Sequence, residues 1–196
     1  MPRLPLRGTT GAAAAVVSSL ALALPVGDAY ANGLSGAAAA AVTPAIAAAP
    51  AATTTGTRAT IERDGTATVP EDAPKVVKRL IAAANEIVGK PYEWGGGHGS
   101  VVDDGYDCSG AVSYALIGAG LLDAPLASTG LMTALSEGQG GWINVYASAD
   151  HAYLEVAGIR LDTSSVGDAS GLSGVRWRPA IGRRAGFAVR HGDVSS

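Results

Sequence analysis

The chain is organised around residues 105–116, whose sequence is GYDCSGAVSYAL. Asp107 is a preferred N-cap residue, and the apolar residues that follow Ser109 recur at helical spacing. The stretch therefore predicts a helix that begins at Cys108, the only cysteine in the 196 residues. A cysteine in the first helical turn feels the positive end of the helix dipole, which favours the nucleophilic thiolate. The flanking Gly105 and Gly110 predict room for a substrate backbone to approach.

The first residues of the chain predict export. Arg3 and Arg7 precede an uncharged, mostly apolar run over residues 8–27, and Ala29-Tyr30-Ala31 offers small residues to a signal peptidase. We therefore expect a secretory signal peptide over residues 1–31. The alternative is an uncleaved membrane anchor, because a run of about 20 residues can span a bilayer. Pro25 and the polar residues inside the run favour cleavage.

Composition excludes several kinds of partner. The formal net charge is −3, and no basic stripe points to nucleic acid or to an anionic surface. No second apolar run reaches spanning length, so we expect no membrane association after cleavage of the signal. An exported protein meets an oxidising environment, where a lone cysteine indicates intermolecular pairing or a free reactive thiol. The alternative is a buried, inert thiol.

The remaining sequence divides into two parts. Residues 32–72 are rich in Ala, Thr and Pro and predict a low-complexity linker, and residues 73–192 predict a globular domain. Helical periodicity predicts a helix between Pro74 and Gly89, ahead of the helix at Cys108. Period-two patterns predict strands only after the helices, which favours an α+β domain with an antiparallel sheet. The expected strands are residues 142–147, 151–156, 159–162 and 186–190, with a further strand edge at Trp177 and Arg178.

A thiolate nucleophile needs a base and a group that orients the base. His151 opens one expected strand and Asp162 closes the next, and a tight hairpin at Ala157-Gly158 would bring both to the same end of the pair. His98, ten residues before Cys108, is the competing base, whereas His191 lies in the C-terminal tail. No two candidate ligands show the spacing of a zinc site, so we expect neither a metal nor another cofactor.

Three segments resemble the NlpC-type cell-wall peptidases, a family of papain-like cysteine enzymes that cut peptidoglycan stem peptides. Tyr92-Glu93-Trp94-Gly95-Gly96 resembles the family's Tyr-x-Trp-Gly-Gly loop, and Tyr106-Asp107-Cys108-Ser109-Gly110 resembles its nucleophile motif. The strand pair from His151 to Thr163 resembles the pair that carries the base. The resemblance implies a papain-like fold, in which N-terminal helices, with the nucleophile at a helix start, pack on a C-terminal antiparallel sheet.

The resemblance also implies roles. Cys108 would be the nucleophile, His151 the general base and Asp162 the orienting residue, while Tyr92 and the Cys108 amide would stabilise the oxyanion. The residues expected to contact substrate are Trp94, Gly95, Gly96, His98, Asp107 and Ser109. The implied protein is a monomeric, secreted or wall-associated bacterial hydrolase that acts on peptidoglycan peptides.

Three departures from the family pattern keep alternatives open. Residues 97–105 form an insertion between the tyrosine loop and the cysteine, and Asp162 stands where the family most often has a histidine. The family's Gly-Asp-Leu strand ahead of the histidine is replaced by Gly140-Gly141-Trp142-Ile143. One alternative is a non-catalytic wall-binding module on the same fold. The other is an amidase that cuts the sugar–peptide link with the same machinery.

Overall fold

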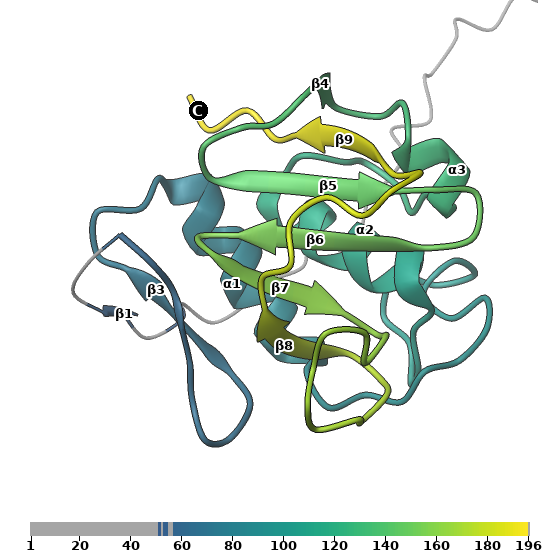
Figure 1. Cartoon of the computed structure of the whole chain (residues 1–196), viewed down its shortest axis with the longest axis horizontal. Coiled ribbons are helices and arrows are strands. Elements are labelled where there is room, and N and C mark those ends of the chain that lie inside the picture. Colours follow the sequence, from purple (N-terminus) through teal and green to yellow (C-terminus); the bar gives the residue numbers. More distant parts are fainter. Residues whose placement is uncertain (1–50, 52, 55–56, 196) are drawn as a thin grey trace, which may run out of the picture. The chain divides into compact units, whose positions relative to one another are not determined.

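The computed structural model describes residues 51, 53–54 and 57–195. The predicted signal peptide, residues 1–31, and part of the predicted linker lie outside these residues. The main element of the described chain is a six-stranded sheet in which every neighbouring pair is antiparallel, in the order β4, β9, β5, β6, β7, β8 (Figure 1). Its strands are β4 Ser136–Glu137, β5 Ile143–Ala147, β6 Ala152–Val156, β7 Ile159–Asp162, β8 Arg176–Pro179 and β9 Ala188–His191.

Helices pack on one face of this sheet. Helix α2 (Cys108–Ala119) contacts β6 and β7, helix α1 (Lys75–Ile87) packs against α2, and the single turn α3 (Ser128–Leu131) contacts β5 and α2. Figure 1 shows α1 and α2 behind the strands. The expected α+β class with an antiparallel sheet is confirmed, but the expected order of helices first and strands second is wrong, because three short strands at residues 53–54, 60–61 and 67–70 precede α1. In the described part of the chain, no helix has both the length and the apolar character needed to cross a membrane.

Helix α2 is the centre of the core. Its side chains are buried on all sides except at Cys108 and Gly118, because α1 lies on one side and the sheet on the other. It ends at Gly120, which has a left-handed φ of 78° and whose N–H bonds back to the carbonyls of the last turn. Gly118 therefore lies inside the helix, and Gly120 ends it.

The hairpin between β6 and β7 sets the position of the candidate base. Ala157 and Gly158 have φ values of 46° and 81°, which is a two-residue turn with both central residues left-handed. The register pairs Val156 with Ile159 and Leu154 with Leu161. Since side chains alternate along a strand, His151 and Asp162 share one face of the sheet, and Leu154 and Leu161 face the helices.

The core begins before the expected domain boundary at Ala73. Strand β3 (Ala67–Pro70) is buried and pairs with β1 (Thr53–Thr54) and β2 (Thr60–Ile61) in a second, three-stranded sheet. The Asn85 amide on α1 exchanges two hydrogen bonds of 2.9 Å with the backbone of Ala67. Residues 57–72, predicted as linker, therefore belong to the compact fold, because small apolar side chains such as Val69 fill the space beside α1.

The tyrosine loop packs directly on the start of α2. The amide of Glu93 donates to the carbonyl of Tyr106, and the amide of Asp107 donates to the carbonyl of Gly96. A Cβ on Gly110 would overlap the Gly96 carbonyl oxygen, and a Cβ on Gly105 would meet the side chain of Glu93. The prediction that Gly105 and Gly110 leave room for substrate is therefore wrong, because the tyrosine loop occupies that space.

We predict that Gly110→Ala destabilises the protein by about 1–3 kcal/mol, because the new methyl group must displace backbone rather than a flexible side chain. Gly99→Ala is the matched control, since a Cβ there meets nothing within 4 Å. Denaturant unfolding of both variants measures the difference. Equal midpoints for the two variants would contradict the close contact between the loop and the helix.

Candidate active site

Cys108 lies at the exposed end of an otherwise buried helix. Asp107 has an extended backbone, and its Oδ1 accepts a 2.7 Å hydrogen bond from the amide of Gly110, as expected of an N-cap. The Cys108 thiol is free and partly exposed. The first amides of a helix have no acceptor within the helix, so the Cys108 amide is available to a ligand. The sulfur and a backbone donor thus lie together at the surface.

His151 is held at the start of β6 by its own turn. The Ser148 hydroxyl accepts from the His151 amide at 3.2 Å, and the Ser148 amide donates to the His151 carbonyl at 2.8 Å. The ring Nε2 lies 2.9 Å from Oδ1 of Asp162. Because an ionised carboxylate can only accept, Nε2 carries the proton and Nδ1 is the nitrogen left for Cys108.

The surroundings of His151 favour its protonated form. Burial lowers its pKa, but the hydrogen bond and charge of Asp162 and the interaction with Cys108 outweigh burial and raise the pKa to about 9. The imidazole therefore keeps its proton through neutral pH and loses it as pH rises through about 9. A protonated imidazole beside a thiol stabilises the thiolate.

Asp162 is itself held from several directions. Its side chain is fully buried, Oδ1 also accepts from the Ser164 amide at 2.8 Å, and Oδ2 accepts from Nη1 of Arg160 at 2.9 Å. Sequence reasoning missed Arg160. The available signal was the spacing of Arg160 and Asp162, because residues two apart on a strand share a face.

Tyr92 borders the same site. A parallel bridge between Tyr92 and Tyr106 places it beside the start of α2, with about half of its surface exposed. Partial burial, and the negative charges of Cys108 and Asp107, raise the pKa of Tyr92 above its usual 10. The phenol is therefore a hydrogen-bond donor over the whole working range of pH.

His98 occupies a different position from His151. Its Nε2 lies 3.1 Å from Oδ1 of Asp107 and 3.2 Å from the hydroxyl of Ser109. Partial burial raises the pKa of Asp107, but hydrogen bonds from Gly110, His98 and Ser109 outweigh it, so the pKa lies below the ordinary value. His98 thus supports the N-cap, whereas His151 is the histidine paired with a buried carboxylate.

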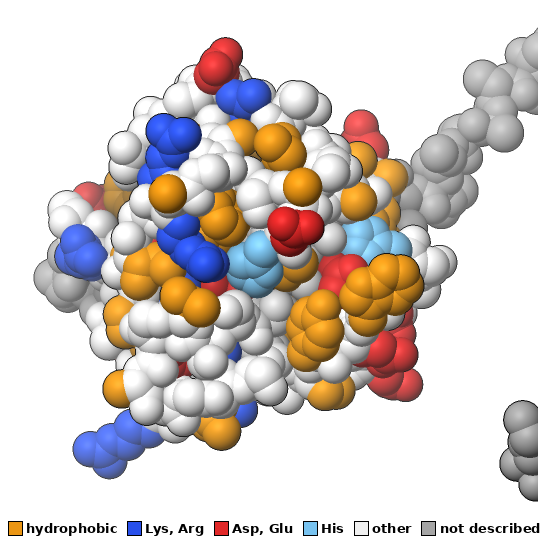
Figure 2. All heavy atoms as spheres, turned by 45° about the vertical axis from the view of Figure 1, so that its right-hand side comes forward, with side chains coloured by type: hydrophobic (Ala, Val, Ile, Leu, Met, Phe, Trp, Pro, Cys, Tyr) orange, Lys and Arg blue, Asp and Glu red, His pale blue; other side chains and the backbone are white. Residues whose placement is uncertain are grey.

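Cys108, Tyr92 and His98 line a cleft of about 440 Å³. Figure 2 shows histidine, acidic and large hydrophobic side chains close together on one face of the molecule. Gly96 does not line the cleft but lies buried behind it, bonded to Asp107. The opposite wall was not predicted: Ala127 and Ser128 come from the start of α3, and Ala149 and Asp150 from the turn before His151. The lining residues are Tyr92, Trp94, Gly95, His98, Asp107, Cys108, Ser109, Ala127, Ser128, Ala149 and Asp150.

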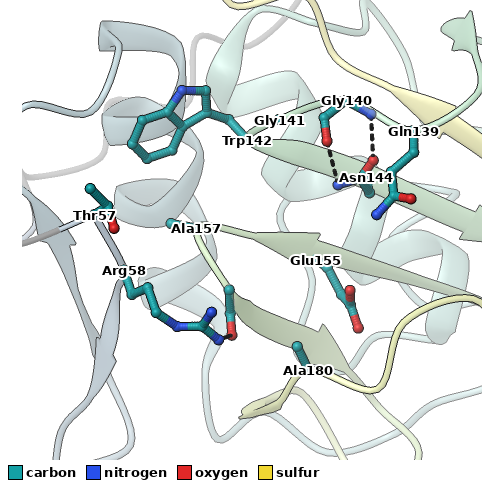
Figure 3. Close-up of a pocket in the computed structure, with 11 residues that line it drawn as sticks. Thr57, Arg58, Gln139, Gly140, Gly141, Trp142, Asn144, Glu155, Ala157 and Ala180 are labelled. Carbon is teal, nitrogen blue, oxygen red and sulfur yellow. Dashed lines mark hydrogen bonds between the residues drawn. The ribbon is translucent and has the colours of Figure 1, made fainter.

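A second cavity, of about 520 Å³, lies at the other end of β6 and contains no cysteine or histidine (Figure 3). Three of its polar side chains, those of Asn144, Arg58 and Glu155, are already engaged within the protein. The Asn144 amide bonds the backbone of Gly140, Arg58 donates to the carbonyl of Gly158, and Glu155 accepts from the amides of Ile181 and Gly182. The smaller cleft at Cys108 is therefore the better candidate for chemistry.

Two further observations concern the remaining ligating groups. Across the residues that the structure describes, no three His, Cys, Asp or Glu side chains come together as a possible metal site. His191 lies on β9, where its Nδ1 is 3.2 Å from the carbonyl of Gly138. It neither lines the cleft nor bonds Asp162, so it is a suitable control residue for substitutions at His151.

We predict that Asp162→Asn lowers the pKa of His151 from about 9 toward the ordinary value of about 6.5, because the variant removes the charge that favours the imidazolium. NMR titration of the histidine rings measures this directly. Asp168→Asn is the control, since Asp168 pairs with Arg178 and not with a histidine. An unchanged titration of His151 in Asp162→Asn would contradict the pairing.

Comparison of this chain with protein-family models, with curated proteins and with solved structures finds no match. Inference about function therefore rests on the geometry around Cys108 and on the motif resemblance at residues 92–96 and 106–110. The geometry brings Cys108, His151, Asp162 and Tyr92 together, with Trp94, Gly95, His98, Asp107 and Ser109 around the same cleft. Of the residues expected at the site, Gly96, His151 and Asp162 do not line the cleft itself, and the Asp162 side chain is fully buried.

Proposed function

We propose that this protein is a cysteine hydrolase that cleaves an amide bond with a Cys108–His151–Asp162 site. The observation that carries the proposal is the 2.9 Å pairing of the His151 imidazole with the buried Asp162 carboxylate, in a histidine whose pKa is also raised by Cys108. The three groups come from α2, from the start of β6 and from the end of β7. Nucleophile, base and orienting group thus occur in the order that covalent catalysis requires.

The reaction follows from this arrangement. The Cys108 thiolate attacks the carbonyl carbon, a C–S bond forms, and the carbonyl electrons move onto oxygen. The tetrahedral intermediate collapses, the C–N bond breaks, and His151 gives its proton to the leaving amine. Water then attacks the thioester, and neutral His151 takes one of its protons. The C–S bond breaks to release the carboxylic acid, and the proton on His151 restores the thiolate–imidazolium pair.

Two donors are available for the oxyanion. The Cys108 amide is at the helix start, where it has no intrahelical acceptor, and the Tyr92 phenol borders the same cleft. Both lie in a partly enclosed site where a donor stabilises developing charge more than it does in water. Tyr92 suits this role because its raised pKa keeps the phenol protonated.

The proposed substrate class is the stem peptide of peptidoglycan. This part of the proposal is supported by the resemblance of residues 92–96 and 106–110 to the NlpC-type motifs. It is also supported by the open shape of the cleft and by Trp94, which is 87% exposed at its rim. We further propose a papain-like arrangement of α2 on the sheet, and export through the signal predicted at residues 1–31.

We predict that Cys108→Ala abolishes release of peptide fragments from peptidoglycan without lowering the unfolding temperature by more than a few degrees, since the side chain is partly exposed. Mass spectrometry of digested wall fragments measures the activity and names the cleaved bond. His151→Ala should also be inactive, whereas His191→Ala should retain activity. Wall binding without cleavage by the wild-type protein would replace the hydrolase with a binding module, and cleavage at the sugar–peptide link would indicate an amidase.

We predict that kcat/KM falls as pH rises through about 9. The pKa of His151 is raised, so the imidazolium that protonates the leaving amine is present below that pH and is lost above it. In Asp162→Asn the alkaline limb should move to lower pH, in step with the NMR titration. A limb that stays at the same pH in both proteins would show that another group controls it.

A further inference from the structure

Arg160 is a buried cation that the catalytic scheme above does not use. Its side chain is 0% exposed, on β7, two residues before Asp162 and on the same face of the sheet. Nη1 donates to Oδ2 of Asp162 at 2.9 Å, and Nη2 donates to the carbonyl of Val166 at 2.5 Å. The guanidinium also lies over the Tyr153 ring, 5.9 Å from its centroid. These three contacts fix the orientation of the guanidinium.

The two carboxylate oxygens of Asp162 have different hydrogen-bond partners. Oδ1 faces Nε2 of His151 and the Ser164 amide, whereas Oδ2 faces Arg160. Without Arg160, Oδ2 would lose its charged donor, although the Asp162 side chain is fully buried. An uncompensated buried carboxylate is costly, so the group would rotate or be protonated, and either change weakens the bond to His151.

We propose that Arg160 is a positioning residue of this site: it holds Oδ2 of Asp162 so that Oδ1 stays on Nε2 of His151 and Nδ1 stays directed to Cys108. The inference rests on the proposed function, because His151 is the base of that scheme. It adds a fourth group, from the same strand as the carboxylate, to the three that perform the chemistry.

The other groups around His151 do not hold the Asp162 carboxylate in place. Cys108, at the start of α2, contributes to the pKa of His151. The ring centroids of Tyr153, on β6, and of Phe187, which is edge-on, lie 6.2 Å and 6.3 Å from that of His151, and the Arg184 guanidinium lies over the Phe187 ring. Asp150 precedes His151 in the chain and lines the cleft. None of these bonds the Asp162 carboxylate, whose hydrogen-bond partners are His151, Ser164 and Arg160.

Arg178 provides a matched control. It is also 0% exposed, and it lies beside Arg160 in the sheet register. Its guanidinium donates to the backbone carbonyls of Asp162 and Leu172 and to the carboxylate of Asp168, but not to the carboxylate of Asp162. Replacing it removes a buried cation of the same kind from the same face without touching the oxygen atoms that hold His151.

The direction in which the pKa of His151 shifts when Arg160 is replaced distinguishes a positioning role from a simple effect of charge. Arg160 is positive, so as a mere nearby charge it repels the imidazolium, and its removal would raise the pKa of His151. If Arg160 instead fixes the carboxylate, its removal frees Asp162, and the pKa of His151 falls from about 9 toward about 6.5. The two explanations therefore predict shifts in opposite directions.

The experiment compares Arg160→Met, Arg160→Lys and Arg178→Met by NMR of nitrogen-labelled histidine, which reports both the pKa and the neutral tautomer of His151. Only samples with native circular dichroism are compared, and Arg160→Lys, which keeps the charge, serves if Arg160→Met does not fold. We expect Arg160→Met to lower the pKa and to mix the tautomers, with an intermediate effect for Arg160→Lys. Arg178→Met should keep the wild-type titration and the Nε2–H tautomer.

A rise or no change in the pKa of His151 in Arg160→Met, or an equal fall in Arg178→Met, would overturn the inference. Peptidoglycan cleavage, measured on the same proteins, should show kcat reduced about tenfold to a hundredfold in Arg160→Met with KM little changed, a loss typical of groups that orient a functional histidine. If the titrations behave as expected and the wild-type protein cleaves nothing, the proposed function fails and the positioning role stands. If the wild type cleaves and Arg160→Met titrates and turns over normally, the positioning role fails alone.

Discussion

The packing of α2 between α1 and the sheet is the constraint on which the rest of the structure depends. A helix that is buried along its length must use small and apolar residues, and it can reach solvent only at an end. At the N-terminal end, Asp107 caps the helix and Cys108 begins it, partly exposed to solvent. The core that stabilises the domain therefore also fixes the position of the sulfur, because the sulfur cannot move without the helix.

A second constraint lies on the opposite face of the sheet. There β6 and β7 carry aromatic and charged side chains, among them Tyr153, Arg160 and Asp162, and the segment after β8 covers them. The Tyr153 hydroxyl donates to the carbonyl of Gly182, and Glu155 accepts from the amides of Ile181 and Gly182. These bonds satisfy polar groups that burial would otherwise penalise. The polar face keeps an ionised carboxylate in the interior, which an apolar face would not tolerate.

Much of the fold and part of the site could be predicted from local patterns. The N-cap at Asp107, the helix before Gly89 and the turn at Ala157-Gly158 are each set by residues adjacent in the chain, and each occurs in the structure. The proximity of His151 and Asp162 followed from that turn alone. Local chemistry suffices in these cases because the tertiary contacts reinforce the local preference.

The remaining features depend on contacts between distant segments, which one sequence does not display. The sequence predicts a linker at residues 57–72 because Ala67 and Val69 are buried by α1 and not by their neighbours in the sequence. The glycines around Cys108 predict open space beside the cysteine, but the tyrosine loop occupies that space. Arg160 was overlooked because charged residues are rarely buried, and only the buried Asp162 explains this one.

The two-residue turn at Ala157-Gly158 has a consequence for how the domain can change over evolution. Side chains alternate along a strand, so inserting or deleting one residue in β7 would slide the pairing and exchange its two faces. The carboxylate would then point among the helices and Leu161 would take its place beside the imidazole. The pairing of the imidazole with the carboxylate therefore depends on the residue count of this hairpin.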